Sequence, residues 1–226
     1  MNYMGIKIRF EKGIVYVTAP NQYILCDVFM RMQEFYESPI EEIRGNYFSV
    51  EKFQDEYAKK FSKFDYHTAW SGFNIPSDVV KRFYHKFFDL STKELHLKNL
   101  LKIHLRSRKK FYVIGTIEGE ADGTLDHEIA HAKYYLKRSY HRSMNRIIRF
   151  MPKYMRNYLI ESLIQMKYDR SVARDEIQAY LSTTLDFLYL TKNFRVKEMS
   201  WVKNKIIHLL TLPYLFKLRR IYKDSK

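Results

Sequence analysis

The sequence predicts a mostly helical α+β fold, with a short antiparallel β-sheet beside the helix that carries His-Glu-Ile-Ala-His at residues 127–131. Three observations lead to this prediction. Hydrophobic residues make up 46% of the 226 residues, which is enough to build a packed core. Short stretches rich in β-branched and aromatic residues predict a few strands. Apolar residues recur at helical spacing over most of the remaining chain.

A hairpin and two helices are expected at the start of the chain. Residues 5–10 and 13–18 are rich in β-branched and aromatic side chains and predict two strands. Apolar residues recur at helical spacing from 22 to 37 and predict a buried amphipathic helix. Ser49 is the expected N-cap of a second helix, which ends near residue 63.

The middle of the chain is expected to combine loops, helices and one strand. Residues 66–76 mix aromatic with turn-forming residues and predict an ordered loop, followed by a helix capped at Ser77. Leucine spacing predicts another helix from residue 92 to 106. Residues 111–117 predict a strand that leads directly into the helix of the histidine motif.

Everything after residue 124 is expected to be helical. The N-cap of the first of these helices is either Asp122 or Thr124, and Pro152 and Pro213 are the expected interruptions. The expected helices span residues 124–138, 141–150, 152–168, 172–190 and 199–223.

The lone cysteine and the apolar segments limit the cellular setting. Cys26 cannot form an internal disulfide, and a Cys-rich zinc module is excluded. The first ten residues alternate charged with apolar side chains, unlike a signal peptide. The most apolar segment, residues 206–216, is far shorter than the roughly 20 residues that cross a bilayer. We therefore expect a cytoplasmic protein without a transmembrane helix, in the host cytoplasm if the chain is viral.

The motif at residues 127–131 predicts a zinc site. Residues four apart lie on one face of a helix, so His127 and His131 can both direct an imidazole nitrogen at one ion. Glu128 can accept a proton from a water molecule whose pKa the ion lowers. The alternative is a structural helix with two hydrogen-bonded histidines.

An open tetrahedral zinc site needs a third protein ligand, and Glu176 is the preferred candidate. It lies in the sequence Asp-Glu-Ile-Gln-Ala-Tyr, on a helix whose apolar positions suggest packing against the core. The other downstream candidates are His141, Glu161, Asp169, Asp175, Asp186, Glu198 and His208.

With these residues, the chain resembles the gluzincin class of zincin metallopeptidases, in which two histidines of HExxH and a glutamate from a later helix bind zinc. The resemblance covers residues 111–181 and implies a zincin-like domain with His127, His131 and Glu176 as ligands and Glu128 as general base. The pairing of the two motifs also resembles uncharacterised HExxH proteins of phages, large viruses and bacteria, which indicates no substrate. We expect one domain over 1–226, with an N-terminal hairpin and helices (1–110), a metal-binding core (111–190) and a basic C-terminal helix (191–226).

One departure from the thermolysin-like pattern lies four residues after the glutamate ligand. That pattern has an aspartate that orients a histidine, whereas this sequence has Tyr180. Tyr180 shares a helix face with Glu176 and can donate to a developing oxyanion, although a core role is the alternative. Asp126 or Asp175 can accept a hydrogen bond from a ligand imidazole, or act as a solvated capping residue.

A formal charge of +15 favours acidic partners such as nucleic acid, anionic lipid or acidic protein segments. Five basic residues form one stripe if the helix continues through Pro152: Arg142, Arg146, Arg149, Lys153 and Arg156. This stripe can hold an acidic peptide or a phosphate backbone, or it is an ordinary solvated helix face. Residues 201–223 mix apolar with basic side chains, which suits either an anionic membrane surface or a terminal helix docked on the core.

The sequence thus supports two functions. The first is a zinc metallopeptidase that acts on a peptide or protein substrate. The second is a basic protein that binds nucleic acid or a membrane surface and has a structural or vestigial zinc site.

Overall fold

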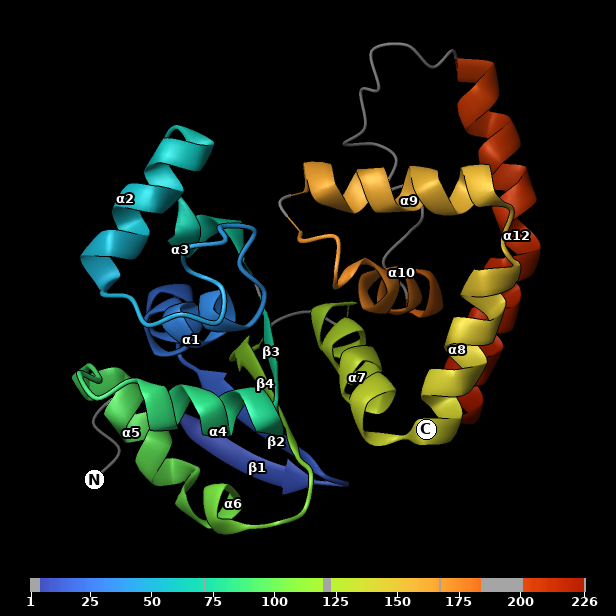
Figure 1. Cartoon of the computed structure of the whole chain (residues 1–226). Helices are drawn as coiled ribbons and strands as arrows, with labels where there is room; N and C mark the ends of the chain where they lie inside the picture. The colour runs from blue at the N-terminus through green and yellow to red at the C-terminus, as the bar shows by residue number, and fades with distance from the viewer. Residues whose placement is uncertain (1–4, 71, 120–122, 167, 184–200, 226) are drawn as a thin grey trace. The chain divides into compact units, whose positions relative to one another are not determined.

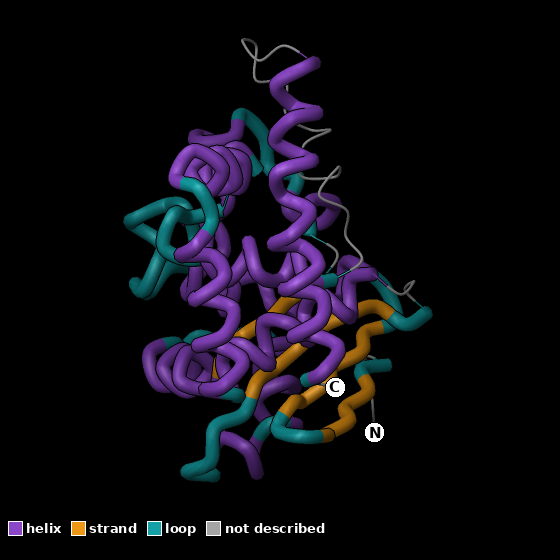
Figure 2. Tube along the Cα trace, turned by 90° about the vertical axis from the view of Figure 1, so that its right-hand side faces the viewer, coloured by secondary structure: helices purple, strands orange, loops and turns teal. Residues whose placement is uncertain are grey.

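The computed structural model describes residues 5–70, 72–119, 123–166, 168–183 and 201–225. Helices dominate and a small sheet is present, so the predicted α+β class is confirmed (Figures 1 and 2). The chain divides into two compact units, Met1–Leu125 and Asp126–Lys226, and this boundary falls within the segment 111–190 that was expected to form one core. The prediction that both units form a single domain stays a prediction.

The first unit contains a four-stranded sheet with the order β1-β2-β4-β3. Its strands are β1 (Lys7–Glu11), β2 (Ile14–Ala19), β3 (Phe73–Pro76) and β4 (Tyr112–Ile117). The pairs β1/β2 and β3/β4 are antiparallel, but β2 and β4 are parallel, so the prediction of an antiparallel sheet is wrong for this central pair. A long helical crossover separates β2 from β4, and this kind of connection is what parallel neighbours require. The placement of the sheet relative to the motif helix stays a prediction.

Residues 66–76, predicted as an ordered loop, contain a short helix α3 (Tyr66–Ala69) and the strand β3. The strand was missed because it has four residues and ends in Pro76, which is unfavourable inside a sheet. Its position at the edge of the sheet makes that proline tolerable. Pairing with β4, rather than local sequence, therefore creates this strand.

Helix α1 (Gln22–Glu37) has the predicted bounds and packs against β2, β3 and β4. The Asn21 side chain caps it by accepting a hydrogen bond from the Ile24 N–H. The packing is close at Gly115 of β4, where an added Cβ would lie 2.6 Å from the ring of Phe29. Phe29 in turn stacks on Phe73. Glycine at 115 thus permits the close approach of helix and sheet.

The remaining helices of the first unit largely follow the predictions. Helix α2 (Val50–Phe61) is capped by Ser49, as expected. Helix α4 (Ser77–Lys86) begins at Ser77 itself, with Pro76 in the cap position and no side-chain cap, so the predicted Ser77 cap is wrong. The helix predicted for 92–106 is two helices, α5 (Thr92–Leu100) and α6 (Lys102–Arg106), which meet at the fully buried Leu101.

All the described secondary structure of the second unit is helical. Its helices are α7 (Gly123–Leu136), α8 (Arg138–Phe150), α9 (Lys153–Gln165), α10 (Ala173–Ser182) and α12 (Trp201–Asp224). Pro152 separates α8 from α9 as predicted, whereas α12 continues through Pro213. Thr124 lies inside α7 and is not its cap, while Asp122 and residues 184–190 lie outside the described residues.

Helix α12 contacts α8 and α10, and Leu215, Leu218 and Tyr222 are buried in the core of this unit. Of the two alternatives for this segment, a terminal helix docked on the core is the one that accounts for this burial over residues 212–223. No helix in the described part of the chain is long and apolar enough to cross a membrane.

Candidate metal centre

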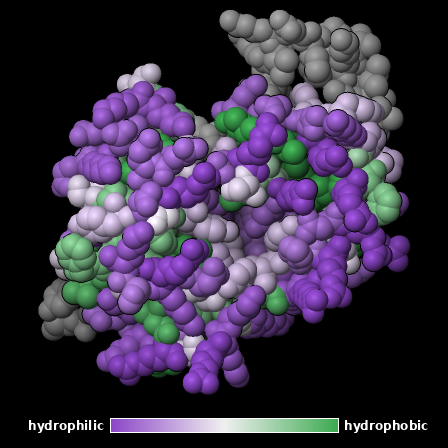
Figure 3. Space-filling model, in the orientation of Figure 1, coloured by the Kyte–Doolittle hydropathy of each residue, from purple (hydrophilic) through white to green (hydrophobic). Residues whose placement is uncertain are grey.

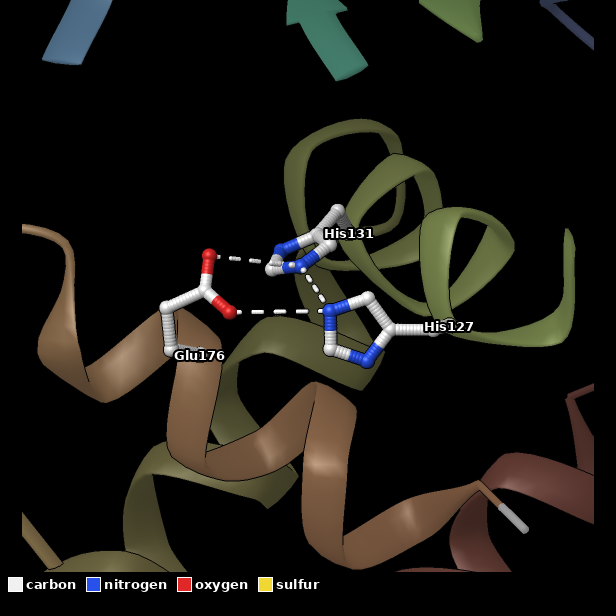
Figure 4. A group of neighbouring side chains, drawn as sticks. All are labelled: His127, His131 and Glu176. Atoms are coloured by element: carbon white, nitrogen blue, oxygen red, sulfur yellow. Dashed lines mark hydrogen bonds and ion pairs between the residues drawn. The ribbon is translucent and has the colours of Figure 1, made fainter. Parts of the chain in front are cut away.

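Two histidines of α7 and a glutamate of α10 point toward one another (Figure 4). His127 and His131 are four residues apart and therefore lie on one face of α7, where their Nε2 atoms are 3.1 Å apart. Glu176 Oε2 lies 3.5 Å from His127 Nε2, and Glu176 Oε1 lies 3.5 Å from His131 Nε2. All three side chains are buried in the second unit.

The three side chains lie close enough together to hold one metal ion. Zinc bonds of about 2.0–2.1 Å to nitrogen and oxygen imply ligand atoms roughly 3.3 Å apart along the edges of a tetrahedron. The two Nε2 atoms are 3.1 Å apart, and each lies 3.5 Å from a different oxygen of Glu176. With one ligand atom taken from each residue, the three atoms lie within 4.8 Å of one another. In addition, Glu176 Oε2 is buried and accepts no hydrogen bond from any described group, so it is available to a metal ion. The residues present could therefore hold a metal ion, and their nitrogen and oxygen donors are of the kinds that zinc accepts.

The other candidate ligands do not reach this centre where they are described. His141 packs on Tyr134 at an exposed position, Glu161 pairs with Arg170, and Asp169 accepts hydrogen bonds from Ser171. Asp186, Glu198 and the side chain of His208 lie outside what the structure describes. Glu176 is thus the carboxylate that the described structure brings to both histidines.

Comparison with protein-family models, with curated proteins and with solved structures finds no match for this chain. The chemistry of the centre must therefore be argued from its own residues.

Of the two aspartates considered as partners of a ligand imidazole, Asp175 contacts one. Its Oδ1 lies 2.9 Å from His131 Nδ1, and the contact is an ion pair rather than a well-aligned hydrogen bond. Asp126 instead accepts a hydrogen bond of 2.7 Å from the Tyr222 hydroxyl. Asp175 therefore holds the ring of His131 from the side opposite to Nε2.

A polar chain behind Asp175 was missed by the sequence analysis. The amide of Gln178 donates to Asp175 Oδ1 over 2.8 Å, and the Tyr140 hydroxyl donates to Gln178 Oε1 over 2.9 Å. Gln178 is fully buried. Its spacing of three from Asp175 on one helix could have indicated the first contact, whereas nothing in the sequence connects Tyr140 of α8 to either residue.

The charges around His131 determine its protonation. Burial alone would lower the pKa of His131, but the carboxylates of Asp175, Glu176 and Glu128 outweigh burial and raise this pKa well above its ordinary value. Without a metal ion, the raised pKa favours the protonated imidazole. A metal ion must displace that proton, so metal binding becomes weaker as the pH falls.

Glu128 is buried beside the two histidines and is not part of the three-residue group. Its charge contributes to the raised pKa of His131 and also to that of Tyr168, a residue near α10. The carboxylate therefore lies within electrostatic reach of both side chains.

Tyr180 also lies at the centre, as its spacing from Glu176 predicts. Its ring centroid is 4.5 Å from that of His127, and its hydroxyl lies 3.0 Å from the hydroxyl of Tyr168. Burial and the charges of Glu176, Tyr180 and Glu128 raise the pKa of Tyr168 well above its ordinary value. Tyr168 was missed because it belongs to the connection between α9 and α10, which has no helical periodicity.

Proposed function

We propose that the protein is a zinc-dependent metallopeptidase of gluzincin type that hydrolyses peptide bonds. One observation carries the proposal: His127, His131 and Glu176 lie 3.1–3.5 Å apart in pairs, beside the buried Glu128. Structural zinc sites use four protein ligands, whereas catalytic sites use three and leave one position open. Three ligands among the described residues, with a carboxylate next to them, favour the catalytic class.

When bound, zinc would polarise the scissile carbonyl and make a water molecule more acidic. Glu128 would take the proton from that water as its oxygen forms a bond to the carbonyl carbon. The same carboxylic acid would then pass the proton to the amide nitrogen as the C–N bond breaks. One peptide bond and one water thus yield a carboxylic acid and an amine, which exchange a proton to become a carboxylate and an ammonium group, and Glu128 returns to its starting state.

The surrounding residues have supporting roles in this proposal. Asp175 orients the His131 ring and increases its basicity, and Gln178 holds Asp175 in place. The Tyr180 hydroxyl would donate a hydrogen bond to the carbonyl oxygen as negative charge develops there. Tyr168, whose hydroxyl contacts that of Tyr180, would keep Tyr180 oriented.

Elemental analysis of the purified protein tests the metal centre. We expect about one zinc per chain in the wild type and in Glu161→Gln, a control that removes an exposed carboxylate of the same unit. His131→Ala and Glu176→Ala should both lose the metal. A wild type that takes up no metal when zinc is supplied would reject the proposal, and loss in His131→Ala alone would remove Glu176 from the ligand set.

The hydrolytic step has a separate test. We would incubate the protein with a proteome-derived peptide library and identify new peptide ends by mass spectrometry. Glu128→Gln should retain zinc and produce no new ends, because an amide cannot accept the proton. Cleavage by this variant at the wild-type rate would reject Glu128 as the base.

The high positive charge favours a second candidate function, binding to nucleic acid or to an anionic membrane surface with a structural or vestigial zinc site. Affinity for DNA, RNA or anionic vesicles that decreases steeply with salt would support it. If the protein binds neither DNA, RNA nor anionic vesicles at low salt, this second function is excluded. A cytoplasmic location, expected from the single free and buried Cys26, belongs to both proposals.

A further inference from the structure

The predicted basic stripe takes a different form in the structure. Because α8 ends before Pro152, the five residues do not lie along one helix. Arg142, Arg146, Arg149 and Arg156 instead line a hollow of about 700 Å³, while Lys153 is not among the lining residues. In Figure 3 hydrophilic side chains gather over α8.

Arginines from three helices converge on this hollow. Arg174 of α10 joins the three arginines of α8 and Arg156 of α9. Arg156 is fixed in part by donating a hydrogen bond of 3.1 Å to the carbonyl oxygen of Arg149. Among the described residues, none of the five guanidinium groups forms an ion pair with a carboxylate. The fold therefore concentrates five positive charges around a hollow in which Asp175 is the one carboxylate among the described lining residues.

The hollow shares one residue with the metal centre. Asp175 lines it and also contacts the imidazole of His131 at 2.9 Å. Tyr134, one turn after His131 on α7, lines the same hollow. Asp175 therefore belongs both to the lining of the hollow and to the surroundings of His131.

The shape and chemistry of the hollow indicate its ligand. Guanidinium groups bind carboxylate and phosphate oxygens through paired hydrogen bonds, which lysine cannot do. A volume of about 700 Å³ lies in the range of sites for whole small molecules, so it exceeds what one anionic group fills. A nucleic-acid backbone usually follows an extended basic track, whereas these arginines converge on one place.

We propose that this arginine hollow binds a segment of the polypeptide substrate that carries several negative charges, as carboxylate or phosphorylated side chains. Arginine clusters are a known means of recognising such motifs. The inference rests on the proposed peptidase function and names its substrate class: proteins with an acidic or phosphorylated segment near the cleaved bond. The hollow thus selects substrates and holds them beside the metal centre.

The test measures binding rather than cleavage, by fluorescence anisotropy with the full-length Glu128→Gln variant. The probes are fluorescein-labelled peptides of one length that contain a run of glutamates, a run of glutamines, or phosphoserines in a serine background. A single-stranded oligonucleotide competes with each. The glutamate or the phosphoserine peptide should bind, and the comparison between these two identifies the preferred anion. The glutamine peptide should not bind.

Two double variants separate the hollow from general charge. Arg146→Gln with Arg149→Gln removes two exposed arginines that line the hollow, and should weaken binding at least about tenfold. Arg138→Gln with Lys153→Gln removes one exposed charge from α8 and one from α9, both outside the hollow, and should change binding less than about twofold. Arg174→Gln should also weaken binding, because Arg174 is the arginine that α10 contributes to the hollow.

Several outcomes would overturn the inference. These are equal weakening in both double variants, no binding of either anionic peptide, or an oligonucleotide that binds more tightly and depends on the same arginines. Thermal unfolding of each variant verifies that its fold is intact. Hydrolysis without arginine-dependent binding would reject this inference alone, and arginine-dependent binding without hydrolysis would reject the peptidase alone.

Discussion

The contact between Asp175 and His131 provides a quantitative test of the metal centre. Asp175→Asn removes the charge but keeps an acceptor oxygen in place, because the Gln178 amide donates to that oxygen. Asp175→Ala removes both charge and acceptor. A carboxylate that contacts a ligand imidazole typically contributes 10- to 100-fold to metal affinity. We therefore expect zinc to bind about tenfold more weakly to Asp175→Asn and about a hundredfold more weakly to Asp175→Ala. These factors correspond to about 1.4 and 2.7 kcal/mol.

Proton competition must be separated from this loss. The carboxylates around His131 raise its pKa, so wild-type zinc affinity should keep rising with pH until that pKa is passed. Without the charge of Asp175 the pKa of His131 is lower, and the affinity of Asp175→Asn should level off at a lower pH. The predicted factors therefore apply to the two plateaus and not to one arbitrary pH.

Chelator-competition titrations over a pH series measure both quantities. Asp126→Asn is the matched control, since the Asp126 carboxylate accepts a hydrogen bond from the Tyr222 hydroxyl, and its plateau should lie within about twofold of the wild type. A plateau of Asp175→Ala equal to that of the wild type would refute the assigned role. Equal losses in the Asp126 and Asp175 variants would show that the effect comes from general charge.

Three further predictions concern stability and turnover. Burial raises the pKa of Glu34 to about 7, although hydrogen bonds from the hydroxyls of Ser38 and Tyr66 lower it. As the pH rises, the unfolded chain therefore loses this proton at a lower pH than the folded chain does. The free energy of unfolding decreases as a result between about pH 4.5 and 7. Between about pH 5 and 8 denaturant titrations should show a loss of about 2 to 3 kcal/mol that is absent in Glu34→Gln, and parallel curves would contradict this. Gly115→Ala should destabilise the chain by about 1–3 kcal/mol in the same assay, because its Cβ would meet the buried ring of Phe29, and an unchanged midpoint would refute the close packing. Tyr180→Phe should lower kcat at constant zinc content, by about 10²-fold or more, whereas an unchanged kcat would leave Tyr180 a core residue.

The elements that the sequence predicted well depend on local interactions. The bounds of α1 and the Ser49 cap of α2 follow from apolar periodicity and from one side chain that bonds the first turn. The strand β3 and the break at Leu101 were missed because they depend on packing within the first unit. The parallel pairing of β2 with β4 was missed for the same reason, since strand periodicity does not define which strands pair.

The sequence by itself determined the histidine pair and its neighbouring glutamate, because a spacing of four residues places two side chains on one face of any α-helix. It also identified Glu176 as the preferred third ligand. Only the tertiary structure brought Glu176 within 3.5 Å of both histidines and distinguished Asp175 from Asp126. It alone gathered five arginines around one hollow. The physical reason is that these contacts join helices far apart along the chain, and their approach depends on how the buried side chains of the whole unit pack.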